Sequence, residues 1–194
     1  MNNDFSTIIL AGGKGQRMGG QDKGLVHYQG HPLIHQSLLL ARQCTRAIVI
    51  SANRNIPQYQ SLADVVIKDN LPDYGGPLFG IQACATSVST DYTLIMACDL
   101  PRLTSDLVQN LQRALFDPAC EFDAVVYRQG GFLQCGLIAI KTPVLTSIDA
   151  ELLCGQQSVR RWLEALPLLI LDSHDAFAFT NFNVPGNFTA DPST

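Results

Sequence analysis

Glycines and cations gather in one segment near the N-terminus, and this combination can bind phosphate. The apolar run Ser6–Ala11 leads directly into a segment that reads GGKGQRMGGQDK over residues 12–23. Backbone N–H groups of glycines can approach phosphate oxygens closely because no Cβ intervenes. Lys14, Arg17 and Lys23 bring three positive charges against the single negative charge of Asp22, in a chain whose formal net charge is −4. The segment therefore predicts a site for a polyanion such as a nucleoside triphosphate.

This segment differs from the two common phosphate-binding motifs. The chain contains no Gly-Lys-Ser or Gly-Lys-Thr, which excludes a P-loop. The dinucleotide pattern G-x-G-x-x-G fails because the glycine that follows Gly13 and Gly15 comes one position late, at Gly19. An NADP-linked oxidoreductase stays open as an alternative, with Arg54 after the second predicted strand meeting the 2′-phosphate. Against it, no catalytic Tyr-Lys pair can be placed in the chain.

A carboxylate follows another apolar run and could hold a metal ion. Asp99 comes just after Tyr92–Ala97 and just before Leu100-Pro101. A hard cation such as Mg²⁺ takes one or two carboxylates together with phosphate oxygens, whereas an isolated aspartate in this place would equally suit a turn. Opposite a triphosphate segment, the metal role is favoured. Asp69, which follows Val65–Ile67, reads on its own as an ordinary turn residue.

The pattern Leu10-Ala11-Gly12-Gly13-x-Gly15-x-Arg17-Met18-Gly19 … Asp22-Lys23 resembles the signature of nucleotidyltransferases, and most closely that of the molybdenum cofactor guanylyltransferases, the MobA family. Related cytidylyltransferases usually carry Leu-Ala-Ala-Gly in this place. The resemblance extends to Pro185 and implies a three-layer αβα, Rossmann-like nucleotidyltransferase fold. It also implies Mg²⁺-dependent transfer of GMP from GTP to the molybdopterin form of the molybdenum cofactor, with release of pyrophosphate. The product would be the guanine dinucleotide cofactor.

The resemblance also implies a role for individual residues. Lys23, Asp99 and Arg17 would be catalytic, with Asp99 as the Mg²⁺ ligand. The GTP-binding set would be Leu10, Ala11, Gly12, Gly13, Lys23, Ser51, Asn53, Asp69 and Asp99. Arg160, Asn181 and Asn183 would lie on the pterin side.

Three positions depart from the family pattern. Ser51 stands where the family usually has asparagine, and Val184 stands where it usually has threonine. The usual proline before Cys135-Gly136-Leu137 is absent. Serine cannot copy a bidentate amide, so Asn53 is expected to take a larger share of base or ribose recognition.

Short apolar runs alternate with helix-length segments, which predicts parallel βαβ units. Only five residues separate the run Ala124–Tyr127 from the run Leu133–Ile140. We therefore expect a hairpin between them, and hence one antiparallel strand in a mostly parallel α/β sheet. Pro32 and Pro77 are expected to open helices, and Thr104 to cap one. The predicted strands are Thr7–Ala11, Ala47–Ser51, Val65–Ile67, Tyr92–Ala97, Ala124–Tyr127, Leu133–Ile140 and Leu168–Leu171. The predicted helices are Leu33–Gln43, Leu78–Ser87, Ser105–Leu115, Val144–Leu152 and Ser158–Leu166.

Polar residues follow several of these strands. The carboxyl ends of parallel strands form the crevice where open α/β sheets bind ligands. We therefore expect Gly12, the segment from Ser51 to Arg54, Asp69 and Asp99 to meet at one edge of the sheet.

Composition narrows the possible classes of protein. The chain has 194 residues, of which 46% are hydrophobic and 15% charged, and this predicts one globular domain. We expect that domain to span residues 1–188, with a nucleotide-binding half over about 1–102, a pterin-binding half over about 103–188 and a loose tail over 189–194. A pI near 5.4 argues against nucleic-acid binding. No apolar stretch is long enough to span a bilayer, so no membrane is expected as a partner.

The remaining expectations concern location, partners and rival functions. Six cysteines, most of them among apolar neighbours and none in a C-x-x-C pair, are expected to be reduced core residues. Together with an N-terminus that lacks signal-peptide character, they predict a cytoplasmic protein. The resemblance implies GTP and the molybdopterin cofactor as ligands, with other cofactor-biosynthesis proteins and recipient molybdoenzymes as partners. Two further alternatives stay open: a nucleotidyltransferase that uses CTP or acts on a sugar or alcohol phosphate, and a non-catalytic GTP-binding regulator.

Overall fold

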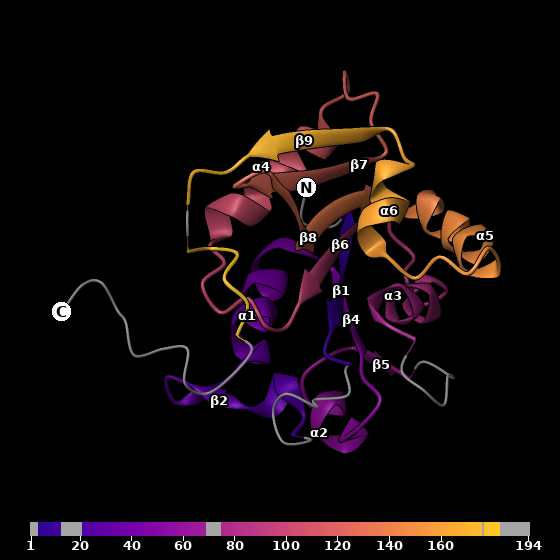
Figure 1. The fold of residues 1–194 in the computed structure, drawn as a ribbon. Helices are drawn as coiled ribbons and strands as arrows, with labels where there is room; N and C mark the ends of the chain where they lie inside the picture. The colour runs from indigo at the N-terminus through magenta and orange to yellow at the C-terminus, as the bar shows by residue number, and fades with distance from the viewer. Residues whose placement is uncertain (1–3, 13–20, 69–74, 176, 183–194) are drawn as a thin grey trace.

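The computed structural model describes residues 4–12, 21–68, 75–175 and 177–182. A seven-stranded sheet with the order β5-β4-β1-β6-β8-β7-β9 forms its centre (Figure 1). The strands are β1 (Phe5–Leu10), β4 (Ala47–Ser51), β5 (Val65–Ile67), β6 (Tyr92–Ala97), β7 (Ala124–Gln129), β8 (Phe132–Lys141) and β9 (Leu168–Asp172).

Helices cover both faces of this sheet and make a three-layer αβα architecture (Figure 1). The helices α1 (Ile34–Cys44) and α4 (Ser105–Phe116) lie together on one face. The opposite face carries α3 (Pro77–Ala85), α5 (Ile148–Leu153), which follows the 3-10 helix η3 (Thr142–Ser147), and α6 (Val159–Glu164). Smaller elements surround the carboxyl end of β1: the 3-10 helix η2 (Lys23–Leu25), the two-stranded pair β2 (His27–Tyr28) and β3 (His31–Pro32), and α2 (Ile56–Gln60).

The central strands are apolar on both sides because both faces are buried, as parallel sheets require. Successive side chains of β1 point to opposite faces. Ile8 packs in one cluster with Leu78 of α3 and Trp162 of α6, whereas Ile9 packs in another with Leu38 of α1. All five side chains are less than 5% exposed. The alternation within β1 thus already assigns its side chains to two hydrophobic cores, one on each face of the sheet.

The predicted topology is confirmed. Among the described strands of the large sheet, β8 alone runs antiparallel, and it lies between β6 and β7. Gly130 and Gly131 have φ of +56° and +84° and form the tight turn between β7 and β8, a conformation that favours glycine. The seven predicted strands all form, with ends that differ by at most two residues.

Several local predictions need correction or confirmation. Pro32 lies in β3 and does not open a helix, since α1 begins two residues later. The first turns of the helix predicted from Val144 are 3-10 helix, and α5 proper begins at Ile148. Pro77 opens α3, and the Thr104 hydroxyl accepts a hydrogen bond from the N–H of Leu107, as predicted. The prediction missed α2 and the β2–β3 pair.

The division into a nucleotide half and a pterin half stays a prediction, and the tail over 189–194 lies outside the described residues. The longest described helix, α4, has 12 residues, well short of the roughly 20 that a bilayer-spanning helix needs. No helix in the described part of the chain is a candidate for spanning a membrane.

Candidate active site

The carboxyl ends of β1, β4 and β6 lie next to one another. Leu10 pairs with Ser51 on one side and with Ala97 on the other. Backbone bonds extend this alignment beyond the strands, because Ala11 N donates to Ser51 O and Cys98 N donates to Leu10 O, at 2.9 and 3.1 Å. The segments that follow the three strands therefore leave the sheet at one edge, as the sequence predicted.

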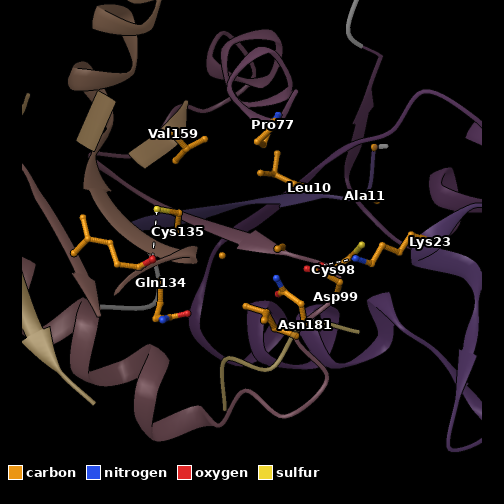
Figure 2. Close-up of a pocket in the computed structure, with 15 residues that line it drawn as sticks. Leu10, Ala11, Lys23, Pro77, Cys98, Asp99, Gln134, Cys135, Val159 and Asn181 are labelled. Atoms are coloured by element: carbon orange, nitrogen blue, oxygen red, sulfur yellow. Dashed lines mark hydrogen bonds and ion pairs between the residues drawn. The ribbon is translucent and has the colours of Figure 1, made fainter. Parts of the chain in front are cut away.

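A pocket of about 540 Å³ opens at this edge (Figure 2). Its lining comes from several parts of the fold: the end of β1 with η2, the end of β6, the first half of β8, the starts of α3 and α6, and the C-terminal segment. The lining residues are Leu10, Ala11, Gly12, Lys23, Pro77, Ala97, Cys98, Asp99, Leu100, Leu133, Gln134, Cys135, Gly136, Val159 and Asn181. Five residues of the predicted GTP set and one of the predicted pterin set are therefore brought together.

Lys23 and Asp99 both line the pocket and contact each other (Figure 2). The Lys23 Nζ lies 2.6 Å from Oδ2 of Asp99, although 76 residues separate them in sequence. The side chains are only 25% and 15% exposed, so water screens this pair less than it screens a surface ion pair. The contact uses one of the two oxygens of the Asp99 carboxylate.

The end of β4 lies directly behind Gly12. A Cβ placed on Gly12 would lie 3.6 Å from Nδ2 of Asn53 and 4.0 Å from Oγ of Ser51. Ser51 itself is 2% exposed and packs against α3, where a Cβ on Gly80 would come within 2.7 Å of its hydroxyl. The structure thus places Ser51 and Asn53 beside Gly12 but outside the pocket lining, and their roles in binding stay predictions.

The C-terminal segment is anchored to the Asp99 turn. The N–H of Phe182 donates to the Asp99 carbonyl oxygen at 2.9 Å, and Phe182 is buried against Leu33 and Tyr28. This anchor brings the neighbouring Asn181 into the pocket lining (Figure 2). Sequence reasoning chose Asn181 by resemblance and missed the phenylalanine that positions it.

Arg160 lies outside the pocket lining. Its Nε lies 2.8 Å from Oε1 of Glu164, one turn further along α6, and both side chains are largely exposed. The hydrogen bond to Glu164 raises the pKa of the guanidinium. Burial raises the pKa of the Cys135 thiol, and the positive charge of Arg160 offsets part of this rise. Its neighbour Val159 is the α6 residue that lines the pocket.

The β8 side of the pocket was not among the predicted site residues. Gln134, Cys135 and Gly136 line it, and a Cβ on Gly136 would lie 2.7 Å from Cδ1 of Leu100. The close approach of the Leu100 side chain to β8 therefore favours glycine here, and the backbone conformation does not require it. The Cys-Gly-Leu match to the family pattern was the available signal for this wall.

The thiol beside Asp99 is unsuited to nucleophilic chemistry. Burial raises the pKa of Cys98 strongly, and the Asp99 carboxylate raises it further. The thiol therefore stays protonated at neutral pH, and a protonated thiol is a weak nucleophile. Cys44 and Cys84 are also buried and Cys154 is exposed, so the expectation that the cysteines are core residues holds for only part of the set.

Some predicted residues fall outside the part of the chain that the structure describes: Gly13, Lys14, Arg17, Asp69 and Asn183. Within the described residues, no group of three or more His, Cys, Asp or Glu side chains could hold a metal ion by itself. A single pocket carboxylate fits a Mg²⁺ that takes most of its ligands from phosphates and water. The arrangement can therefore bind a polyphosphate with its accompanying cation.

Comparison with known proteins gives a consistent result. The family described as the MobA-like NTP transferase domain matches residues 7–170. Molybdenum cofactor guanylyltransferases from Pseudomonas syringae pv. tomato and Bordetella petrii are each 38% identical to the chain. The alignments cover 93% of the chain in both cases, and 89% and 93% of the two relatives. A third relative of the same name, from Vibrio atlanticus, is 37% identical over 95% of the chain and 93% of its own length.

Solved structures show the same fold at low sequence identity. Molybdopterin-guanine dinucleotide biosynthesis protein A from Archaeoglobus fulgidus superposes with a TM-score of 0.72 at 19% identity, over 93% of each chain. The 4-diphosphocytidyl-2C-methyl-D-erythritol synthase from Anaerococcus prevotii gives a TM-score of 0.71 at 9% identity, also over 93% of each chain. Because the fold is shared by proteins named for different nucleotides, it does not by itself assign the nucleotide.

Proposed function

The chain belongs to the MobA-like NTP transferase family, and from this premise we propose that it transfers GMP from GTP to the molybdopterin form of the molybdenum cofactor. The observation that carries the proposal is the Lys23–Asp99 pair at the wall of a pocket of about 540 Å³. The relatives' name supports the guanylyl group and the acceptor. The product is the guanine dinucleotide form of the cofactor, together with pyrophosphate.

The reaction forms one P–O bond and breaks another. An oxygen of the terminal phosphate of molybdopterin attacks the α-phosphorus of GTP in line, and the bond from that phosphorus to the α–β bridging oxygen breaks. Such transfers depend mainly on positioning and charge neutralisation, and they need no protein nucleophile. This agrees with a pocket in which the Cys98 thiol stays protonated.

Lys23 supplies positive charge to the triphosphate in this proposal. Its ammonium contacts Asp99 at 2.6 Å, and Lys23 lines the same pocket as Gly12. Backbone N–H groups of the glycine segment would add donors for phosphate oxygens. Residues of β8 and Asn181 line the same pocket, and they would form the wall against which the pterin substrate binds.

Mg²⁺ is proposed as the cofactor, with Asp99 as its protein ligand. When bound, the cation would neutralise charge on the triphosphate oxygens. The lysine contact is made by Oδ2 of Asp99, and a carboxylate has a second oxygen with which it can contact a cation at the same time. The remaining ligands would come from phosphates and water.

Thermal unfolding identifies the nucleotide that binds: Tm is measured with GTP, CTP, ATP and NADPH, each with and without Mg²⁺. Ligand at about a hundredfold over its Kd adds ~2.7 kcal/mol by mass action. For a chain of this size, that corresponds to a rise in Tm of roughly 5–11 °C. We expect this rise with GTP and Mg²⁺ only. A larger rise with CTP would reassign the nucleotide, and a larger rise with NADPH would overturn the nucleotidyltransferase proposal.

The role of Lys23 is tested with a matched lysine. Lys23→Ala is expected to lower GMP transfer by about 10- to 100-fold, the value of a lost charge-assisted contact of about 1.5–3 kcal/mol. Lys141→Ala is the control, because it also removes an ion-paired lysine, 3.2 Å from Asp123, but outside the pocket. Equal activity of the two variants would contradict the proposed placement of the triphosphate.

A further inference from the structure

Two residues that the sequence did not single out hold the carboxylate of Asp22, the residue just before Lys23. Tyr59 of α2 donates its hydroxyl to Oδ1 of Asp22 at 2.6 Å. The Asn55 side-chain amide donates to Oδ2 of Asp22 at 3.0 Å. Both carboxylate oxygens are thereby engaged, and none of the three residues lines the pocket.

Asp22 begins the turn that carries Lys23. Leu25 N donates to Asp22 O at 3.1 Å, and Val26 N donates to Lys23 O at 3.3 Å. A 3-10 helix of three residues is too short to be stable by itself, because the first turn fixes several dihedral angles for a single hydrogen bond. The conformation of this turn must therefore be fixed by its contacts with the rest of the fold.

Tyr59 provides a rigid contact for the turn. Its side chain is fully buried, in the cluster that includes Ile50 and Ile34. The turn packs so closely on it that a Cβ on Gly24 would lie 2.5 Å from the phenol oxygen. Burial raises the pKa of Tyr59, and the hydrogen bond to Asp22 raises it further, so the phenol stays a donor.

The charge of Asp22 explains why it needs two partners. A carboxylate adjacent to Lys23 would repel a bound triphosphate if it turned into the pocket. The donors of Tyr59 and Asn55 hold it outside the pocket lining, while the next residue extends its ammonium to Asp99. Asn55 has φ of +50°, a left-handed conformation that asparagine tolerates better than most residues.

We propose that Tyr59 and Asn55 are positioning residues for nucleotidyl transfer, which act through Asp22 to place the Lys23 ammonium on the triphosphate. This inference rests on the proposed function. It assigns the short α2 segment a purpose beyond packing. Lys23, which delivers the charge, lies in the connection between β1 and β4. Tyr59 and Asn55, which fix its direction, lie in the next connection, between β4 and β5.

A double-mutant cycle between Tyr59→Phe and Lys23→Ala tests the proposal. We expect Tyr59→Phe to lower kcat for GMP transfer by about tenfold in the wild-type background, because Lys23 is no longer fixed. In the Lys23→Ala background the same change should lower kcat by less than about twofold. The loss of Tm caused by Tyr59→Phe should be the same in both backgrounds, since the buried hydroxyl is lost in both.

Tyr127→Phe is the matched control. Tyr127 is 4% exposed and donates to the Leu107 carbonyl oxygen at 3.2 Å, away from the pocket. It should lower Tm and leave kcat unchanged in both backgrounds. Asn55→Gly is the second variant, because glycine keeps the left-handed backbone while the amide is removed. It should show the same coupling to Lys23→Ala as Tyr59→Phe does.

The outcomes separate the inference from the proposed function. If Lys23→Ala keeps wild-type activity, the proposed function fails. If Lys23→Ala is impaired but Tyr59→Phe and Asn55→Gly lower kcat by equal factors in both backgrounds, the two residues act only on the fold. That result, or a kcat for both variants no lower than that of Tyr127→Phe, would overturn the inference.

Discussion

Gly24→Ala is expected to destabilise the turn that carries Lys23 by steric conflict with Tyr59. The added Cβ would lie 2.5 Å from the Tyr59 phenol oxygen and 3.4 Å from the Cβ of Ala11. Ordinary contact needs a separation roughly 1 Å greater than the first of these distances. Tyr59 is fully buried and hydrogen-bonded to Asp22, so neither the ring nor its hydroxyl can move freely.

The size of the effect follows from this geometry. Inserting a methyl group into a filled site costs about 1–3 kcal/mol in free energy of unfolding. For a chain of this length, that is a loss in Tm of roughly 2–12 °C. The measurement is thermal unfolding followed by circular dichroism. Gly12→Ala is the control, because its added Cβ has no neighbour among the described residues closer than 3.6 Å.

The cause is identified by a second substitution. Tyr59→Phe removes the conflicting oxygen, and the nearest ring atom, Cζ, is then 3.4 Å from the added Cβ. In that background Gly24→Ala should change Tm by less than about 2 °C. If Gly24→Ala lowers Tm equally with tyrosine and with phenylalanine at position 59, the conflict is not with the hydroxyl and the described packing is wrong.

Three further predictions concern the metal, the pterin wall and pH. Asp99→Asn should leave Tm within a few degrees of wild type and abolish most GMP transfer, because an amide binds Mg²⁺ poorly; activity near wild type at limiting Mg²⁺ would show that Asp99 is only a turn residue. In Gly136→Ala the added Cβ would lie 2.7 Å from Cδ1 of Leu100 and should displace that side chain. We expect KM to rise more for the molybdopterin substrate than for GTP, and equal rises would place GTP on this wall. Burial raises the pKa of the Cys44 thiol from 9.0 to about 11, so the unfolded chain loses this proton at a lower pH than the folded chain does. Between pH 9 and 11 the free energy of unfolding should therefore fall by about 2 kcal/mol more in wild type than in Cys44→Ala. Urea-unfolding midpoints that shift equally with pH in the two proteins would contradict this.

The sequence alone determined the strands of the sheet and the edge at which Gly12 and Asp99 lie. Apolar runs of strand length, separated by segments of helix length, leave few arrangements, and right-handed crossovers order the parallel strands. The short connection at Gly130-Gly131 identified β8 as the antiparallel strand. Residues that follow strands directly, such as Gly12 and Asp99, could be assigned to one sheet edge from their place in the chain.

The small elements around this edge could not be predicted in the same way. Each strand of the β2–β3 pair has two residues, too few for an alternating pattern to be visible. The helix α2 has five residues, a proline in its first turn and a left-handed Asn55 before it. Local signals of this kind are weak, and packing against the rest of the fold decides them.

Only the tertiary structure decided which side chains meet. The Lys23–Asp99 contact joins residues 76 apart, and the Tyr59–Asp22 contact joins residues 37 apart. Strand order β4-β1-β6 brings their three segments together, and the buried Tyr59 then holds the Asp22 carboxylate. Spacing along the chain carries no information on such directions, because they depend on close packing between elements that are distant in sequence.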